Sequence, residues 1–330
     1  MPMHILLVNH APIPVFAYGG TERVVWDLGK QLVQQGHRLT YLVPAGSHCD
    51  FAEVRVIDPA KSWREQIPAD VDIAHFQFDP GFAPGEEPGC AWMVTEHGNA
   101  RAGWPLPLNT VFVSRNHAAR YGSTAYVHNG LDWSAYGPVH WTLPRTHHHF
   151  LGKAAWRVKN VKGAITVARR AGVRLAVMGG TRLNLRRGFR FTWSRQVQFY
   201  GMVGGAQKTQ LLNASNGLIF PVRWHEPFGL AVIESLYFGC PVFSTPYGAL
   251  PELVPEDCGL LSAQADVLAD AVRAGRFDPR ACHQRAVTHF SAARMAAGYL
   301  EKYAQVLAGE VLNPVAPAIQ GEARQLPWND

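Results

Sequence analysis

The chain has 330 residues, of which 47% are hydrophobic and 17% are charged, and its formal net charge is +6 at pH 7. A chain of this length usually folds as two domains, and its hydrophobic content is sufficient for two buried cores. The mild positive charge favours anionic ligands or an anionic membrane surface, but the chain lacks both a basic arm and a nucleic-acid-binding signature, which argues against a nucleic-acid partner.

Five cysteines are scattered along the chain, and no C-x-x-C pair is present. We therefore expect neither a disulfide framework nor a cysteine-based zinc site, and we expect a reducing compartment. The first residues, MPMHILLVNHAP, lack the charged start and the long apolar segment of a signal peptide. No segment approaches the roughly 18 apolar residues of a membrane span. The sequence predicts a cytoplasmic protein.

The start of the chain has the pattern of a βαβ unit. A short apolar run at residues 4–9 predicts a buried strand, and residues 38–44 predict a second one. Between them we expect a helix from Thr21, as its N-cap, to about Gln35, with Gly36 ending it. This order of elements implies a parallel sheet.

The first half continues with three more strand patterns, and the second half repeats the α/β order after a loosened stretch between Pro138 and Pro144. The further strands of the first half are predicted at residues 71–78, 91–97 and 109–114, with a surface loop at 79–89. In the second half, the predicted strands are 148–153, 173–180, 197–203, 216–222 and 241–246, and the predicted helices are 160–172, 206–215 and 229–239.

The fold class expected from these patterns is α/β, with two doubly wound parallel-sheet domains that face a cleft. We place the domains at residues 1–140 and 145–289, and residues 290–330 form a third segment with the longest helical pattern, at 290–309. Because ligands of open parallel sheets bind beyond the carboxyl ends of the strands, the loops that follow strands hold the site candidates.

Two candidates lie in the first half. Gly19 and Gly20 precede a helix whose first N–H groups favour an anion, but the dinucleotide fingerprint G-x-G-x-x-G is absent, and an ordinary turn is the alternative. His97 ends a predicted strand where it opens into the cleft; a lone histidine is more often structural than functional.

The second half contains two lysines beside a predicted helix start. Lys153 and Lys159 flank the loop between a strand and the helix at 160–172. Two cations near a helix N-terminus suit a diphosphate, and the alternative is a solvated basic loop. The triple histidine at 147–149 does not predict a metal site, because consecutive strand residues alternate faces.

The stretch IFPVRWHEPFGLAVIESL, residues 219–236, has the pattern of a strand, a loop and a helix. The N–H groups of Phe228, Gly229 and Leu230 would open the helix and donate to phosphate or sugar oxygens. Glu226 precedes the helix and can accept hydrogen bonds from sugar hydroxyls. Glu234 lies in an apolar stretch, where a buried carboxylate needs partners, and it can reach a vicinal diol such as a ribose. The alternative is a surface helix with two glutamates.

This stretch resembles the retaining glycosyltransferases of family 4, which have the GT-B fold and two glutamates in an E-P-F-G-x-x-x-x-E frame. The resemblance extends along nearly the whole chain: GGTERVVWDLGKQLVQQGH is similar to the first-helix motif, YVHNGLD to an N-G-x-D signature, and FLGK with VKNVKG to a G-R…K pair. FYGMV and PELV also fit. The chain departs from the family pattern at Lys153, where arginine is usual, and lysine lacks the bidentate fork.

The resemblance implies a role for each matching position. The first domain would be the acceptor side, the second the nucleotide-sugar donor side, and the C-terminal helix would return to the first domain. The implied catalytic residues are His97, Lys153, Lys159 and Glu226; the implied donor-binding residues are Gly19, Gly20, Met202, Val203, Phe228, Gly229, Leu230 and Glu234. In these roles the lysines neutralise the diphosphate, Met202 and Val203 contact the base, and Glu234 holds the ribose.

The implied reaction is transfer from a nucleotide-diphospho-sugar with retention at the anomeric carbon, and UDP is favoured over GDP. No metal or other cofactor is expected, since lysines and a helix end replace Mg²⁺ at the leaving phosphate. The phosphate itself would take the acceptor's proton, so Glu226 is not assigned as a nucleophile. Alternatives are a GT-B sugar-nucleotide epimerase and a non-catalytic nucleotide-sugar-binding protein. A nicotinamide dehydrogenase is a weaker alternative still, because this chain lacks the glycine fingerprint of such enzymes.

The acceptor is expected to be a saccharide, a lipid-linked molecule or a natural product, because the loops after the first-half strands are mostly neutral or aromatic. The candidates there are His10, Tyr18 and Arg101. The basic stretch at residues 182–195 has three interpretations: a peripheral membrane contact, a contact with an anionic substrate, and, slightly favoured, a solvated loop.

Overall fold

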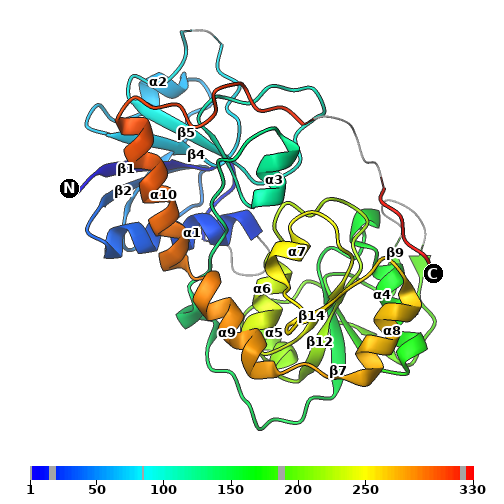
Figure 1. Ribbon diagram of the computed structural model, residues 1–330. Helices are drawn as coiled ribbons and strands as arrows, with labels where there is room; N and C mark the ends of the chain where they lie inside the picture. The colour runs from blue at the N-terminus through cyan, green and yellow to red at the C-terminus, as the bar shows by residue number, and fades with distance from the viewer. Residues whose placement is uncertain (1, 15–19, 84, 185–189, 320–324) are drawn as a thin grey trace. The chain divides into compact units, whose positions relative to one another are not determined.

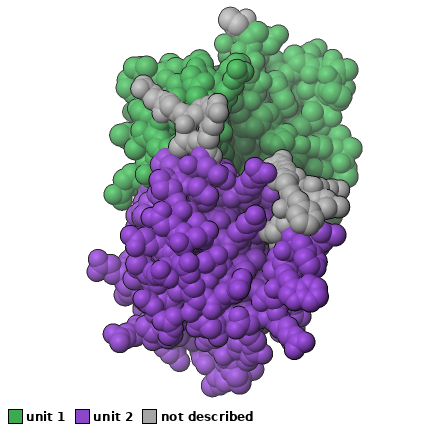
Figure 2. Space-filling model, turned by 90° about the vertical axis from the view of Figure 1, so that its right-hand side faces the viewer, with its two compact units in different colours: residues 1–15, 19–132, 290–322 green, residues 16–18, 133–289, 323–330 purple. Residues whose placement is uncertain are grey.

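The computed structural model describes residues 2–14, 20–83, 85–184, 190–319 and 325–330. These residues form two compact units (Figure 2). Unit 1 contains residues 2–14, 20–132 and 290–319, and unit 2 contains residues 133–289 and 325–330 within the described ranges. The chain therefore changes unit between Asp132 and Trp133 and again between His289 and Phe290, and the last residues return to unit 2.

Unit 1 is a parallel six-stranded sheet in the order β3-β2-β1-β4-β5-β6, with helices packed on it (Figure 1). The strands are β1 His4–Val8, β2 Arg38–Val43, β3 Glu53–Val56, β4 Ile73–Phe76, β5 Ala91–Glu96 and β6 Thr110–Phe112, and the helices are α1 Gly20–Gln34, α2 Trp63–Gln66, α3 Arg115–Arg120 and α10 Ala292–Leu307. The predicted N-cap at Thr21 is wrong, because α1 already begins at Gly20.

Helix α1 joins unit 1 because its apolar side chains recur at helical spacing. Val24, Leu28 and Leu32 follow one another at four-residue steps and are buried, as is Val25. The same face lets α1 pack against α10, although the two helices are more than 250 residues apart in sequence (Figure 1). The C-terminal helix is thereby part of the unit that the N-terminal strands form.

The NGLD signature lies where the chain leaves unit 1, beside the segment that re-enters it. The Leu131 N–H donates to the Phe290 carbonyl at 3.0 Å, and the Ala292 N–H donates to the Leu131 carbonyl at 2.9 Å. A Cβ on Gly130 would lie 2.2 Å from the Ser291 carbonyl oxygen, so no other residue allows this approach. The motif therefore holds the two crossing segments together.

Asp27 of α1 connects to the same signature and gives a pH-dependent prediction. Its buried carboxylate accepts the Asp132 N–H at 2.9 Å, and burial raises its pKa from 3.8 to about 6. Since the folded-state pKa is the higher one, stability is lost as pH rises from about 4 to 6. We compare the free energy of unfolding of Asp27→Asn with that of the wild type at each pH. The difference should favour the variant by about 2–3 kcal/mol more at pH 7 than at pH 4. Urea unfolding at both pH values measures this; parallel pH profiles would contradict it.

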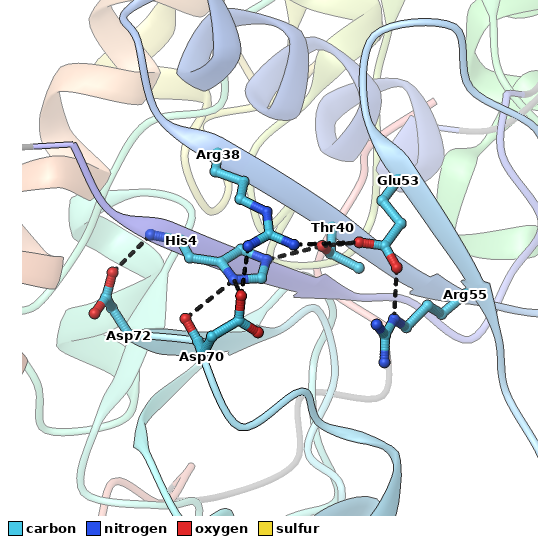
Figure 3. A network of polar contacts seen from close by, with 7 residues as sticks. All are labelled: His4, Arg38, Thr40, Glu53, Arg55, Asp70 and Asp72. Carbon is cyan, nitrogen blue, oxygen red and sulfur yellow. Dashed lines mark hydrogen bonds and ion pairs between the residues drawn. The ribbon is translucent and has the colours of Figure 1, made fainter.

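A polar network lies near the amino ends of the unit 1 strands (Figure 3). The His4 ring contacts the Asp70 carbonyl at 3.1 Å and the Thr40 hydroxyl at 2.9 Å. Glu53 accepts from Arg55 at 2.7 Å, and Arg38 pairs with both Asp70 and Glu53. This network joins strands β1, β2 and β3 and lies away from the carboxyl ends, where ligands of parallel sheets bind.

Unit 2 repeats the architecture with a parallel six-stranded sheet in the order β11-β8-β7-β12-β13-β14. Its strands are β7 His147–Leu151, β8 Leu175–Met178, β11 Val197–Phe199, β12 Ser215–Phe220, β13 Val242–Ser244 and β14 Gly259–Leu261; β9 Leu183–Asn184 and β10 Arg190–Phe191 form a separate hairpin. The helices are α4 Val161–Ala171, α5 Gly205–Asn213, α6 Leu230–Tyr237, α7 Leu250–Leu253, α8 Ala265–Ala274 and α9 Pro279–His289, with short 3₁₀ turns η1 Trp133–Tyr136 and η2 Arg157–Lys159.

The triple histidine forms part of β7, and its middle and last members are buried. The His149 ring lies between the hydroxyls of Ser215 and Ser235, at 2.6 and 2.8 Å. His148 lies against the Phe243 ring, 6.0 Å away between centroids. Both side chains belong to the core of unit 2.

Each sheet has one point at which the strand order reverses. In unit 1, β1 pairs with β2 on one side and with β4 on the other; in unit 2, β7 pairs with β8 and with β12. At such a point the loops after the two central strands diverge and leave room for a ligand. The residues that follow β1, β4, β7 and β12 are therefore candidates for ligand contacts.

Candidate functional site

The carboxyl edge of the unit 2 sheet collects most of the predicted donor residues. Lys153 follows β7, Glu226 follows β12, and Met202 and Val203 follow β11. Strand order places the loops of β11, β8, β7 and β12 next to one another along this edge. Lys153 and Glu226, which are 73 positions apart in the sequence, thus follow strands at the same end of one sheet.

Glu226 and Lys159 form a partly buried ion pair at this edge. The Lys159 Nζ lies 2.7 and 2.9 Å from the two carboxylate oxygens of Glu226, and the Trp224 Nε1–H donates to Glu226 Oε2 at 2.7 Å. Aromatic rings enclose the same ammonium, since Nζ lies 4.8 Å from the Trp224 ring centroid and 5.2 Å from that of Phe220. The cation is therefore held in one place before any ligand arrives.

The helix α6 begins directly beyond Glu226, in a conformation that only glycine adopts easily. Gly229 has φ of 112° and supplies no capping side chain. The Ala249 N–H donates to the Glu226 carbonyl at 2.9 Å, which fixes the loop before the helix. The N-terminal end of α6, with Phe228, Gly229 and Leu230, thus lies close to the Glu226 side chain, since a Cβ on Gly229 would lie 3.6 Å from Glu226 Cγ. The free N–H groups of a helix N-terminus attract anions.

Glu234, predicted to need partners, has two of them. Its side chain is 2% exposed and forms an ion pair with Lys208 of α5, and the Tyr136 hydroxyl donates to the same oxygen, Oε1, at 2.6 Å. Lys208 also lies under the Tyr136 ring, 5.8 Å from its centroid. Sequence reasoning missed both Lys208 and Tyr136.

The remaining donor candidates differ in exposure. Lys153 lies 5.2 Å from the Trp156 ring centroid, beside η2. Met202 is 45% exposed, whereas Val203 is 6% exposed and belongs to the core. A base that stacks here would therefore meet the Met202 side chain but only the backbone of Val203.

At the carboxyl edge of unit 1, His97 is paired with a residue that the sequence did not single out. His97 Nε2 lies 2.9 Å from Gln77 Oε1, and Gln77 directly follows β4. With the amide oxygen as acceptor, Nε2 carries the proton and Nδ1 keeps its lone pair. Burial, with a smaller contribution from His10, lowers the pKa of His97 to about 4, so the ring is neutral at pH 7.

Two buried polar atoms near this edge, Asn9 Oδ1 and Gln77 Nε2, have no hydrogen-bond partner among the described residues. Asn9 is 1% exposed, follows β1 and donates through Nδ2 to the Ala11 carbonyl. Buried polar groups are normally satisfied, so an unsatisfied group at a strand-order reversal indicates a place for water or a ligand.

The other unit 1 candidates have different surroundings. His10 is exposed and lies edge-on to Phe78, with ring centroids 5.1 Å apart. Arg101 is exposed in the loop after β5, and Gly20 is the first residue of α1. The predicted positions Tyr18 and Gly19 lie outside the described residues.

The described part of the chain contains neither a metal-binding cluster of side chains nor a membrane-spanning helix. Within it, no group of three or more His, Cys, Asp or Glu side chains is placed to hold a metal ion. No helix among the same residues has the length and hydropathy required to span a membrane.

Comparison with known proteins gives a family match over part of the chain and a fold. Residues 143–274 match the family model of the glycosyl transferases group 1. AviGT4, a glycosyltransferase involved in avilamycin A biosynthesis, is 23% identical, with a TM-score of 0.74 over 93% of this chain and 99% of that one. The sucrose-phosphate synthase of Thermosynechococcus elongatus is 18% identical, with a TM-score of 0.69 over 93% and 100%.

A third similar structure is HepE of Anabaena in complex with UDP and glucose, 14% identical, with a TM-score of 0.66 over 92% of this chain and 99% of that one. No curated protein sequence matches the chain. The predicted GT-B fold is confirmed, and so is the predicted resemblance to group 1 glycosyltransferases, whose family match covers the strands and loops that carry Lys159, Glu226 and Glu234.

Proposed function

We propose that this chain, whose residues 143–274 match the group 1 glycosyltransferases, transfers a sugar from a nucleotide-diphospho-sugar to an acceptor with retention at the anomeric carbon. The observation that carries the proposal is the carboxyl edge of unit 2. There, the Lys159–Glu226 pair and the start of α6 follow the two strands that flank the reversal of strand order. Cations, a carboxylate and a helix N-terminus are what phosphate and sugar hydroxyls bind.

The leaving diphosphate is assigned to the lysines and the helix end. Departure of the nucleotide builds negative charge on its phosphate, and preorganised donors stabilise that charge best when they need not move. Lys159 satisfies this requirement because Glu226, Trp224 and Phe220 already hold its ammonium. Lys153, which is not in that ion pair, adds a second positive charge from the loop after β7. This set would act without Mg²⁺.

The ribose is assigned to Glu234 and the sugar to Glu226. A carboxylate can accept about four hydrogen bonds, so a diol can be added to the bonds that Glu234 accepts from Lys208 and Tyr136. Those two bonds fix the carboxylate before the ribose arrives. We take UDP as the first nucleotide to test and GDP as the second, since HepE, of the same fold, was crystallised with UDP.

The acceptor is assigned to unit 1, and His97 to the reacting sugar. A neutral ring with a lone pair on Nδ1 can accept a hydrogen bond from a hydroxyl, and Gln77 orients it. The acceptor's proton would pass to the departing phosphate, so no carboxylate nucleophile is used. AviGT4 acts in natural-product biosynthesis, which favours a saccharide or natural-product acceptor over a lipid-linked one.

A cytoplasmic location belongs to the same proposal. Membrane contact through residues 182–195 remains a prediction, since residues 185–189 of that stretch lie outside the described ranges. The Arg182 guanidinium donates to the carbonyls of Thr192, Ser194 and Val197. Its hydrogen bonds are therefore made within this part of unit 2.

The first test is thermal unfolding with UDP, GDP and their common sugars, each with and without Mg²⁺. A nucleotide at about 100 times its Kd stabilises the folded state by about 2.7 kcal/mol, which raises Tm by about 5–10 °C in a domain of this size. The shift should occur with one nucleotide series, be independent of Mg²⁺, and disappear in Glu234→Gln. No shift with any nucleotide would overturn the proposal.

Turnover then separates transfer from its alternatives. Glu226→Gln should lower the transfer rate about a hundredfold, because the sugar loses its positioning contact and Lys159 loses its partner. Conversion of the donor to another sugar nucleotide in the absence of an acceptor would identify an epimerase instead. Nucleotide binding with neither product would identify a binding protein.

A further inference from the structure

Unit 1 contains a cavity that none of the assigned donor residues lines. It has a volume of about 730 Å³, within the usual size range of small-molecule sites. The loop after β4 contributes Asp79, Phe82 and Glu87, strand β5 contributes Trp92, and the end of the next loop contributes Trp104 and Leu108.

The cavity adjoins the loop after β4, and its lining extends toward the amino end of β5, away from His97. Trp92 is the second residue of β5, whereas His97 follows the carboxyl end of the same strand. Five residues of strand span about 16 Å. The described carboxyl-edge residues Asn9, Gln77 and His97 are not among the cavity's lining residues. A ligand in this cavity therefore does not occupy the position assigned to the reacting sugar.

Aromatic side chains form the walls, and one of them is fixed in an exposed position. Trp104 is 52% exposed, and its indole N–H donates to Asp79 Oδ2 at 3.1 Å. Phe82 meets Trp92 edge-to-face, with ring centroids 4.9 Å apart and planes at 89°. Leu108 adds another exposed apolar side chain at the rim. An exposed indole held by a hydrogen bond, next to other apolar groups, is typical of a binding surface.

The charge of the cavity is opposite to that of the chain. Asp79 and Glu87 are acidic, and the lining residues, all within the described ranges, include no lysine, arginine or histidine. The chain as a whole carries +6. Main-chain N–H groups orient both carboxylates: Gly81 donates to Asp79 at 3.0 Å and Gly85 to Glu87 at 2.8 Å. Indole faces beside carboxylates attract a cation through both the ring quadrupole and the negative charge.

We propose that this cavity binds an organic cation, a molecule with a protonated or quaternary amine on an apolar or sugar-like body. The cationic group lies between the Trp104 face and the Asp79 and Glu87 carboxylates, and the body of the molecule contacts Phe82, Trp92 and Leu108. The inference does not depend on the proposed glycosyl transfer, because it uses a different part of unit 1.

The test compares choline with 3,3-dimethylbutan-1-ol, its neutral isostere, by isothermal titration calorimetry on the full chain. Choline keeps its charge at every pH, so only the protein titrates. We expect choline to bind in the millimolar range and the isostere to bind at least about tenfold more weakly. Equal binding of the two, or no binding of choline up to about 50 mM, would overturn the proposal.

Variants locate the binding. Trp104→Ala should weaken choline binding at least about fivefold, and Asp79→Asn about tenfold. The matched controls are Trp193→Ala, which removes a tryptophan that is 88% exposed in unit 2, and Asp270→Asn, which removes an exposed carboxylate. Both controls should bind choline as wild type does. An equal loss in Trp193→Ala would refute the assignment.

A nucleotide-induced Tm shift that persists in Trp104→Ala shows that the variant is folded and that its donor site is intact. Failure of the cation site can therefore be distinguished from failure of the proposed transferase.

Discussion

Lys208→Met should lower the stability of unit 2 by about 3–5 kcal/mol and its Tm by about 10 °C. The substitution leaves the Glu234 carboxylate, 2% exposed, without the ammonium that faces it. A hydrogen bond from a neutral hydroxyl such as that of Tyr136 does not compensate a buried negative charge. Differential scanning calorimetry with and without nucleotide measures the effect.

The double variant Lys208→Met/Glu234→Gln separates the structural role of the pair from ligand binding. Replacing both members of a buried ion pair by neutral groups of similar size is often nearly neutral. We expect the double variant to regain at least half of the lost stability. It should still fail to respond to nucleotide, because the glutamine lacks the charged acceptor assigned to the ribose.

An exposed pair of the same unit serves as the control. Arg273 and Asp270 form a salt bridge on α8, with side chains 57% and 72% exposed. Arg273→Met should change Tm by less than about 2 °C, since surface pairs contribute little. If Lys208→Met also changed Tm by less than about 2 °C, the Lys208–Glu234 pair would not be what stabilises the packing of α5 against α6.

The alternating strand and helix patterns predicted most of both sheets, because apolar runs bounded by glycine and proline mark buried parallel strands. The strand patterns at 4–9 and 148–153 became β1 and β7, the centres of the two sheets. The edge strands β6 and β11 were predicted, but two other edge strands were missed. β3 has one partly buried and three exposed residues and little apolar pattern, and β14 is only three residues long. Helices α7, α8 and α9 were also not predicted.

Within the site, the sequence predicted the need for partners but not the partners themselves. Glu234 was expected to be paired because its neighbours are apolar, whereas Lys208 lies 26 residues away on another helix. One local signal was available: Lys208 and Leu212 are four residues apart on α5 and both face the interior. A lysine on the apolar face of a helix needs a buried partner.

Gln77 was missed for a different reason. A glutamine at the end of a strand has no distinctive local pattern, and its importance depends on the sheet order. Only the placement of β5 next to β4 brings Gln77 to His97. Strand order is a tertiary property, so the pair could not be predicted from either segment alone.

Acidification to pH 5 should destabilise unit 1 by several kcal/mol and unfold it before unit 2. Burial lowers the pKa of three unit 1 histidines: His75 to about 3, His97 to about 4 and His117 to about 3. Since these folded-state pKa values lie below the ordinary 6.5, the unfolded chain binds protons first, and stability is lost as pH falls below 6.5. At pH 5 each histidine contributes a loss of about 2 kcal/mol.

At pH 5 the three histidines together lower the free energy of unfolding of unit 1 by about 6 kcal/mol, and protonation of Asp27 restores about 1 kcal/mol of it. The remainder is comparable with the total stability of a domain. In unit 2, burial lowers the pKa of His148 to about 4, that of His149 well below its usual range, and also that of His147. Burial lowers the pKa of His37 in unit 1 as well, so among the described residues three such histidines act in unit 2 against four in unit 1.

Near-UV circular dichroism and hydrogen exchange between pH 7 and pH 4 measure this loss unit by unit. The His117→Phe variant removes one titrating ring from between Phe112 and Tyr121 and keeps the aromatic packing. Its unfolding midpoint should shift to lower pH by a few tenths of a unit, because two of three proton-linked losses remain. A midpoint that does not move would contradict the lowered pKa assigned to the His117 ring.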